Sequence, residues 1–148
     1  MTETVFVDTS VLLYARDAGE PVKQPRAQAW LEALWEQQRG RLSHQVLNEY
    51  YVAATRKLQP GLDRETARAD VRDFMAWRPI GIDSALLEDA WWLEARFGLS
   101  FWDSLVVAGA RAAGCRYLLT EDLQHGQDLD GLAVVDPFAM RPQDLNLS

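Results

Sequence analysis

Short apolar runs alternate with longer helical patterns along this chain, and this alternation constrains its fold more than any other feature. The expected strands lie at residues 5–7, 41–42, 79–82, 116–120 and 133–135. Between them, apolar side chains recur at three- and four-residue steps, which is the period of an amphipathic helix. Strands separated by helices predict an α/β fold with a central, mainly parallel sheet flanked by helices on both faces.

Capping residues and helix breakers set the expected helix boundaries. The helices are expected over residues 10–16, from Pro25 to a break at Gly40, and over residues 43–58, 63–75, 83–97 and 100–113. Ser43, Asp63 and Asp83 have side chains that suit an N-cap, and Gly98 follows a helix where glycine is favoured. No repeat or long linker interrupts this pattern, so residues 1–148 are expected to form one domain.

The composition narrows the class of protein. Hydrophobic residues make up 48% of the chain and charged residues 25%, as in globular proteins. No apolar run approaches the roughly 20 residues that span a bilayer, no signal-peptide pattern is present, and the lone Cys115 excludes an intrachain disulfide, so we expect a cytoplasmic protein. The formal net charge of −7 disfavours nucleic-acid binding through a large basic surface, but it is compatible with an enzyme that contacts phosphates through bound cations.

Asp8 ends the first apolar run, in the stretch VFVDTS, and two interpretations of it stay open. Ligands of parallel α/β sheets bind at the carboxyl ends of the strands, where Asp8 is expected to lie. The alternative is an N-cap for the next helix, although Thr9 or Ser10 could perform that task equally well.

Two further acids lie within predicted helices. Glu49 shares its helix face with Val46 and Val52, and a carboxylate on an apolar stripe is costly unless it is paired or bound to metal. Asp103 follows Ser100 at the spacing of a capping box, yet it also lies in a first turn, where an anion is favoured. The sequence does not separate these two roles of Asp103.

Asp122 follows the expected strand at 116–120 and is expected to lie at the same edge of the sheet as Asp8. An acid in a turn is the plain alternative. Glu121 is a rival for any role there, and Thr120 could orient a neighbouring carboxylate.

The four acids Asp8, Glu49, Asp103 and Asp122 indicate a class of chemistry. Their oxygens suit Mg²⁺ or Mn²⁺, whereas the two histidines and the cysteine lack zinc-ligand spacing. The sequence contains no phosphate-binding loop, no GxGxxG and no GxSxG motif. Metal-assisted phosphoryl transfer or hydrolysis is the chemistry that remains.

The chain resembles the PIN-domain ribonucleases of the VapC toxin type. The resemblance rests on VFVDTSVLLYA, VLNEYY, LSFWDSLVVAGARAAGC and YLLTEDLQHG, in that order. It implies a PIN-like three-layer fold and an endoribonuclease that uses Mg²⁺ or Mn²⁺ to cut single-stranded RNA. The acidic set that it implies is Asp8, Glu49, Asp103 and Asp122, with Ser10 and Thr120 as polar helpers. We expect Asp8 and Asp103 to be direct metal ligands, and we leave open whether the other two act directly, through water or by positioning water.

The resemblance also implies a homodimer and a small antitoxin protein whose tail blocks the acidic site. The sequence adds some support for an interface, because six tryptophans are many for one small core. Adjacent Trp91 and Trp92 cannot face the same way on a helix, and tryptophan is common in interface cores. Burial in the core is the alternative for any single one.

Three other functions are alternatives to this one. A haloacid-dehalogenase-type phosphatase typically has a second Asp where this chain has Ser10, and a response-regulator receiver needs a lysine near its last strand, whereas no lysine follows Lys57. A catalytically inactive RNA- or protein-binding module of the same fold is the third alternative, and an assay of RNA cleavage separates it from the enzyme.

Overall fold

The computed structural model describes residues 3–147, which form a five-stranded sheet in the order β2-β1-β3-β5-β4. The strands are β1 (Val5–Val7), β2 (Gly40–Arg41), β3 (Tyr117–Leu119), β4 (Asp128–Leu129) and β5 (Leu132–Val135). All neighbouring strands are parallel except β4, which pairs antiparallel with β5. The predicted α/β fold with a mainly parallel sheet is confirmed.

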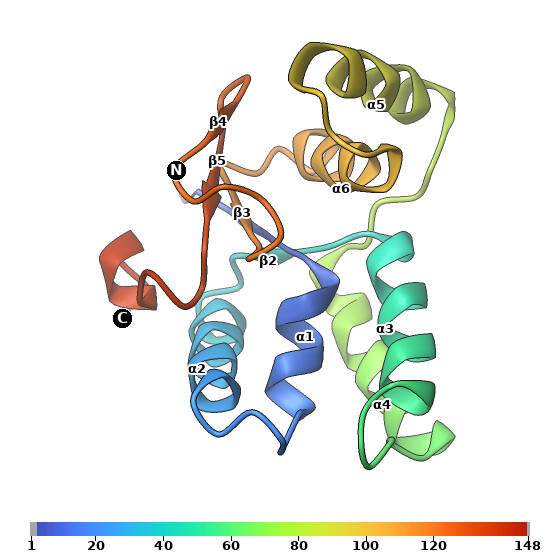
Figure 1. Ribbon diagram of the computed structural model, residues 1–148, viewed down its shortest axis with the longest axis vertical. Helices are drawn as coiled ribbons and strands as arrows, with labels where there is room; N and C mark the ends of the chain where they lie inside the picture. The colour runs from blue at the N-terminus through green and yellow to red at the C-terminus, as the bar shows by residue number, and fades with distance from the viewer. Residues whose placement is uncertain (1–2, 148) are drawn as a thin grey trace.

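Helices cover the sheet from two sides. They are α1 (Thr9–Arg16), α2 (Lys23–Glu36), α3 (His44–Arg56), α4 (Arg64–Phe74), α5 (Ser84–Phe97) and α6 (Phe101–Ala112), with short 3₁₀ turns at Met75–Trp77 and Pro142–Leu145. Figure 1 shows α5 and α6 together at the upper right, beside the sheet, and α1 to α4 below it. No helix within residues 3–147 is long and apolar enough to cross a membrane.

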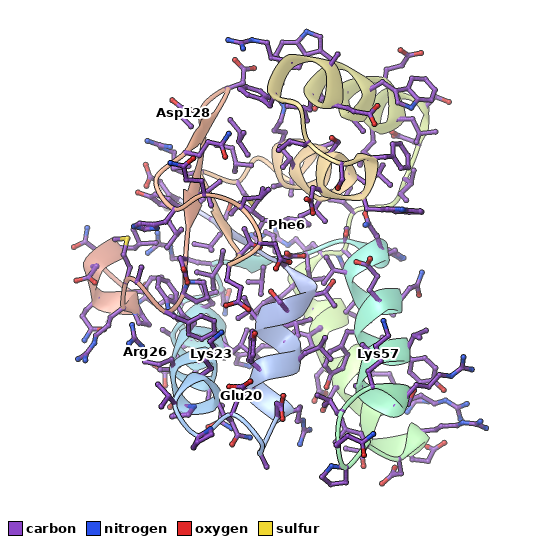
Figure 2. All side chains as sticks on the ribbon, in the orientation of Figure 1. Phe6, Glu20, Lys23, Arg26, Lys57 and Asp128 are labelled. Atoms are coloured by element: carbon purple, nitrogen blue, oxygen red, sulfur yellow. The ribbon has the colours of Figure 1, made fainter. Side chains whose placement is uncertain are left out.

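The first strand lies at the centre of the core. Val5, Phe6 and Val7 are all fully buried, and β1 pairs with β2 on one side and with β3 on the other. Phe6 lies in the interior between the sheet and the helices (Figure 2). Buried β-branched and aromatic side chains favour such a central strand, so the core fixes the position of the residue that follows it, Asp8.

The predicted caps are confirmed. The side chains of Ser43, Asp63 and Asp83 each accept a hydrogen bond from a backbone N–H in the first turn of α3, α4 and α5. Gly98 ends α5 in the left-handed conformation, with φ of 68°, which glycine adopts without a Cβ penalty.

Several predicted boundaries are wrong. Helix α2 begins at Lys23, because Pro25 lies in the first turn, where its missing N–H removes no helical hydrogen bond. The expected strand at 79–82 is only an isolated bridge between Ser43 and Ile80. Met75, expected on an inner face, is 49% exposed, because α4 has already given way to a 3₁₀ turn there.

Strand β4 was missed by the sequence analysis. It forms a tight hairpin with β5, in which Asp130 and Gly131 both have positive φ, of 57° and 95°. An Asp-Gly pair is a strong signal for this type of hairpin turn, and it was present in the sequence.

Candidate functional site

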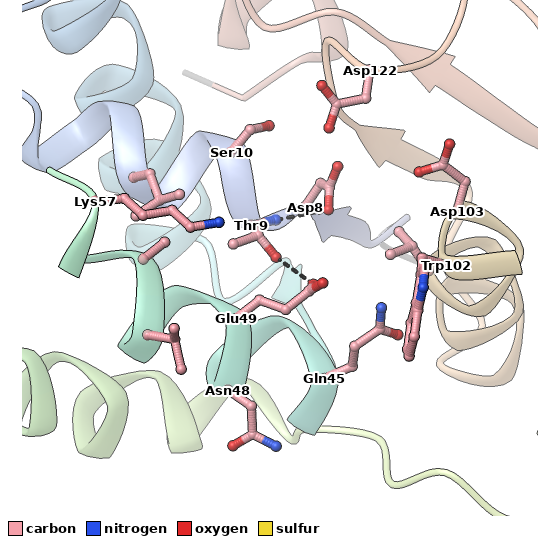
Figure 3. Close-up of a pocket in the computed structure, with 14 residues that line it drawn as sticks. Asp8, Thr9, Ser10, Gln45, Asn48, Glu49, Lys57, Trp102, Asp103 and Asp122 are labelled. Carbon is pink, nitrogen blue, oxygen red and sulfur yellow. Dashed lines mark hydrogen bonds between the residues drawn. The ribbon is translucent and has the colours of Figure 1, made fainter. Parts of the chain in front are cut away.

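All four predicted acids line one cleft at the carboxyl ends of β1 and β3. Figure 3 shows this cleft, with Asp8 at the start of α1, Glu49 on α3, Asp103 on α6 and Asp122 after β3. The chain leaves β1 toward β2 on one side and reaches β3 on the other. The cleft therefore lies at the point where the strand order reverses, which is where parallel α/β sheets bind ligands.

Asp8 is the buried member of the set, with a residue exposure of 8%. Its Oδ1 accepts a hydrogen bond from the Thr9 N–H, at 2.8 Å, and its Oδ2 accepts one from the Thr120 hydroxyl, also at 2.8 Å. Asp8 is thus the N-cap of α1 and also lines the cleft. The helix-cap interpretation is confirmed, and it occupies only Oδ1, so it does not exclude a role in ligand binding.

The hydroxyls after Asp8 do not cap the helix. The Thr9 hydroxyl donates to Glu49 Oε1, at 3.0 Å, and so links α1 to α3. The Ser10 Oγ is buried and has no hydrogen-bond partner among the described residues. A buried polar atom without a partner is uncommon in proteins, and here it belongs to a residue that lines the cleft.

Burial and clustered charge raise the pKa of two of the acids. Burial raises the pKa of Asp8 to about 7; the bonds from Thr120 and Thr9 act against this shift, and the negative charge of Asp122 adds to it. The pKa of Asp122 is also raised, mainly by partial burial of its carboxyl group and further by the charges of Asp103 and Glu121. A cation in the cleft would offset this excess of negative charge.

Glu49 is exposed, contrary to the argument from its helix face. The expected apolar stripe is only partly buried, since Val46 is fully buried but Val52 is 43% exposed. The carboxylate of Glu49 therefore lies at the open side of the cleft. Because it is exposed, the argument that a buried carboxylate must be paired or bound to metal does not apply to it.

The two possible roles of Asp103 are divided between two residues. The Ser100 Oγ accepts a hydrogen bond from the Asp103 N–H, at 3.1 Å, and is the N-cap of α6. The half-buried carboxylate of Asp103 lines the cleft.

Glu121 and Asp122 have separate environments. Glu121 accepts hydrogen bonds from the Tyr14 hydroxyl and from Lys23 Nζ, the latter at 3.0 Å. Asp122 lines the cleft, and its backbone N–H donates to the Thr120 Oγ1, at 3.1 Å. Thr120 therefore connects Asp8 to Asp122, and the rival role of Glu121 is not supported.

Four polar or aromatic residues line the cleft without having been predicted as site residues: Gln45, Asn48, Lys57 and Trp102. Gln45 lies four residues before Glu49 and Lys57 eight residues after it, so following the face of α3 that carries Glu49 would have found these two. Asn48 and Trp102 directly precede Glu49 and Asp103.

The donor set fits a hard divalent cation. Its four carboxylates and the unpartnered Ser10 hydroxyl are the oxygen ligands that such ions prefer. As the side chains stand, no group of three or more His, Cys, Asp or Glu within residues 3–147 is arranged to hold a metal ion.

Comparison with known proteins places the chain in a family. The model of the PIN domain matches residues 5–127, most of the chain. The chain belongs to the PIN domain family. The resemblance seen in the sequence is confirmed at this level, and so is the PIN-like fold. A comparison with curated proteins found no match.

Several solved structures are similar to this PIN domain. VapC20 of Mycobacterium tuberculosis, a toxin that cleaves the sarcin-ricin loop, is 26% identical, with a TM-score of 0.60 over 78% of this chain and 87% of that one. A toxin–antitoxin complex from Klebsiella pneumoniae is 18% identical, with a TM-score of 0.63 over 90% of this chain and 98% of that one. The structure of FitAB bound to the IR36 DNA fragment is 16% identical, with a TM-score of 0.71 over 93% of this chain and 98% of that one. The last two show a shared fold, and family membership together with VapC20 supports a nuclease.

Proposed function

We propose that this protein is a Mg²⁺-dependent endoribonuclease that acts as the toxin of a toxin–antitoxin pair. The observation that carries the proposal is the meeting of four carboxylates, from four separate elements, in one cleft at the switch point of a PIN-domain sheet. The likeness to VapC20, a toxin that cleaves the sarcin-ricin loop, supports a nucleic-acid-cleaving toxin, and we take the substrate to be RNA.

Asp8 and Asp103 would hold the ion directly, and Mn²⁺ would suit the same oxygens. A divalent ion supplies a Lewis acid that activates water and offsets charge on the phosphate oxygens. The bonds from Thr9 and Thr120 fix both oxygens of Asp8 in place. Such fixed carboxylates need little reorganisation when the phosphate binds.

Glu49 and Asp122 would complete the site from its two sides. Glu49 lies at the open side, where its bond from Thr9 holds it in position to orient the attacking water. Asp122, held near Asp8 through Thr120, would bind the ion directly or through water.

Lys57 would bind an RNA phosphate beside the acids. It is the only Lys or Arg among the described residues that line the cleft, and its side chain extends toward Thr9 and Glu49 in Figure 3. A chain with a net charge of −7 cannot hold RNA by a general basic surface. Local contacts of this kind, together with the metal, would bind the RNA.

A cognate antitoxin would block this cleft with a segment of its chain, and the active form would be a homodimer. Exposed tryptophans support a protein interface. Trp91 and Trp92, on α5, are 50% and 46% exposed, and large exposed aromatic side chains are typical of contact surfaces.

Cleavage of a single-stranded RNA tests the proposal. The purified protein should cleave RNA with Mg²⁺ and should not cleave it with EDTA. Asp103→Asn should lower the rate at least a hundredfold, as expected for loss of a group that acts on the reacting centre. The matched control is Asp73→Asn, which alters an exposed carboxylate on α4, outside the cleft.

The result that contradicts the proposal is equally clear. A folded wild-type protein that binds RNA but never cleaves it with Mg²⁺ or Mn²⁺ would be a binding module of the same fold. Unchanged cleavage by folded Asp103→Asn would exclude the mechanism.

A further inference from the structure

A second hollow adjoins the acidic cleft and has a different character. It is lined by His44, Gln45, Asn48, Glu49, Gly81, Ile82 and Trp102, and four of these residues also line the acidic cleft. The two hollows therefore form one continuous groove between α3 and the start of α6.

Trp102 gives this second hollow an aromatic wall. Its residue exposure is 63%, the largest of the exposed tryptophans. Its recorded ring contact is edge-on with Phe101, at 5.3 Å between ring centres, so a face of the indole is not covered by that contact. Trp102 directly precedes Asp103, which sets this wall next to the acids.

Gln45 adds an unused hydrogen-bond donor. This residue is only 9% exposed, and its Nε2 has no hydrogen-bond partner among the described residues. In Figure 3 its amide group lies between the acids and the Trp102 ring. A buried donor that stays unsatisfied is unfavourable, so a ligand that accepts from it gains from the contact.

We infer that this hollow binds one unpaired nucleobase next to the phosphate that is cut, with Trp102 stacking on the base and Gln45 bonding to its edge. The inference rests on the proposed function and adds a binding subsite to it. An aromatic face beside an amide is the combination that recognises splayed bases in single-stranded RNA.

The groove as a whole gives the RNA a direction. Figure 3 shows Asp8 and Glu49 between Lys57 on one side and Trp102 on the other. Lys57 would contact a phosphate at one end, and the base would stack at the other. A protein segment is the other candidate occupant of this hollow, and the experiments below distinguish it from RNA.

Binding of RNA to the nuclease-silenced Asp103→Asn protein tests this inference without cleavage. The probe is a short single-stranded RNA with a fluorophore, and the readout is its anisotropy in Mg²⁺. Trp102→Ala should weaken binding roughly 5- to 150-fold, the range for loss of one stacked base. Trp102→Phe should restore most of the affinity, and Trp35→Ala, which removes a tryptophan of α2 that is 44% exposed and lies outside the groove, should leave it unchanged.

A second variant fills the hollow without touching Trp102 or Gln45. A Cβ built at Gly81 meets no atom within 4 Å, so Gly81→Leu should fold normally and place a branched side chain at the base subsite. It should weaken binding as Trp102→Ala does. Circular dichroism of each variant checks the fold.

An abasic series locates the base. In this series each RNA probe lacks a different base. One of the abasic probes should bind the Asp103→Asn protein more weakly than the intact probe does. The same probe should bind the Asp103→Asn/Trp102→Ala protein as well as the intact probe does, because the missing base and the missing indole remove the same contact. Equal effects of every abasic probe on both proteins would overturn the inference. The inference would also be overturned if the Trp102→Ala variant bound RNA with unchanged affinity but sedimented differently, because Trp102 would then contact another protein chain.

The outcomes separate the two proposals. Trp102-dependent binding without any cleavage by the wild type would overturn the nuclease and keep the base subsite. Cleavage with no effect of Trp102→Ala or Gly81→Leu on binding would do the reverse.

Discussion

Thr120 is the best place to test how the fold prepares Asp8. Its side chain is 1% exposed, and its hydroxyl donates to Asp8 Oδ2, at 2.8 Å, while accepting from the Asp122 N–H, at 3.1 Å. Thr120→Val keeps the shape and removes both bonds. A hydrogen bond to a charged group contributes about 1.5–3 kcal/mol to stability, and one between neutral groups about 1 kcal/mol. The cost of Thr120→Val should therefore depend on whether Asp8 is ionised.

The direction in which stability changes with pH follows from the pKa of Asp8. Burial raises it to about 7, so in the folded protein without metal Asp8 is neutral well below that pH and charged above it. A raised folded pKa means that the contribution of Asp8 to stability is full below its unfolded pKa and is lost as pH rises through about 7. The Thr120 bond lowers this pKa, so its removal raises the pKa further and extends the loss to higher pH.

The measurement is urea unfolding in EDTA at about pH 5 and about pH 9. Thr120→Val should lower the free energy of unfolding by about 2 kcal/mol at the lower pH, where both lost bonds join neutral groups, and by about 2.5–4 kcal/mol at the higher one, with an unchanged slope against urea. Thr120→Ser, which keeps the hydroxyl, should show the same loss at both values. An equal cost of Thr120→Val at both pH values would refute the idea that Thr120 stabilises the charged form of Asp8.

Three further predictions use other parts of the structure. Mg²⁺ at a hundredfold excess over its Kd should raise the free energy of unfolding of the wild type by about 2.7 kcal/mol. The affinity for Mg²⁺ should increase as pH rises through about 7, because the ion competes with the proton on Asp8. Thermal melts with and without Mg²⁺ measure both effects, and a melting shift that persists in Asp8→Asn would contradict them. Glu121→Gln should leave the rate of RNA cleavage within a few-fold of the wild type, whereas Asp122→Asn should lower it at least tenfold. The reason is that Asp122, unlike Glu121, lines the cleft. Equal losses of rate in the two variants would mean that both acids act in cleavage. Gly40→Ala should lower the free energy of unfolding, measured in urea, by about 1–3 kcal/mol through overpacking. The reason is that the new Cβ would lie 2.7 Å from the Trp77 ring. An unchanged free energy of unfolding would show that Trp77 can move.

Local signals predicted the parts of the fold that local chemistry determines. The run Val5–Val7 followed by Asp8 marked the central strand and its acid, and the caps at Ser43, Asp63 and Asp83 were all correct. These features depend on a few neighbouring residues and on backbone groups that must find partners. The hairpin at Asp130 and Gly131 was of the same kind and could have been predicted.

The site was only partly predictable, because its details depend on contacts between distant segments. The gathering of the four acids followed from strand order, yet their burial did not: the face of Glu49 is open, and Asp8 is the enclosed one. Glu121 could not be separated from Asp122 by sequence, since its partners Tyr14 and Lys23 come from α1 and α2, about a hundred residues away. The catalytic and metal-binding roles of the acids stay predictions.

The stability of this fold and its proposed chemistry depend on the same residue. Asp8 follows a strand whose side chains are fully buried, so the core carries a carboxylate into a place where its charged form is unfavourable. Protonation relieves that cost at low pH, and a divalent cation would relieve it at neutral pH while keeping the carboxylate available as a ligand. Thr9 and Thr120 each offset part of the cost through one oxygen of Asp8, and neither bond neutralises the charge. The cleft should therefore favour a cation, because Lys57 is the only Lys or Arg among the described residues that line it, against four carboxylates.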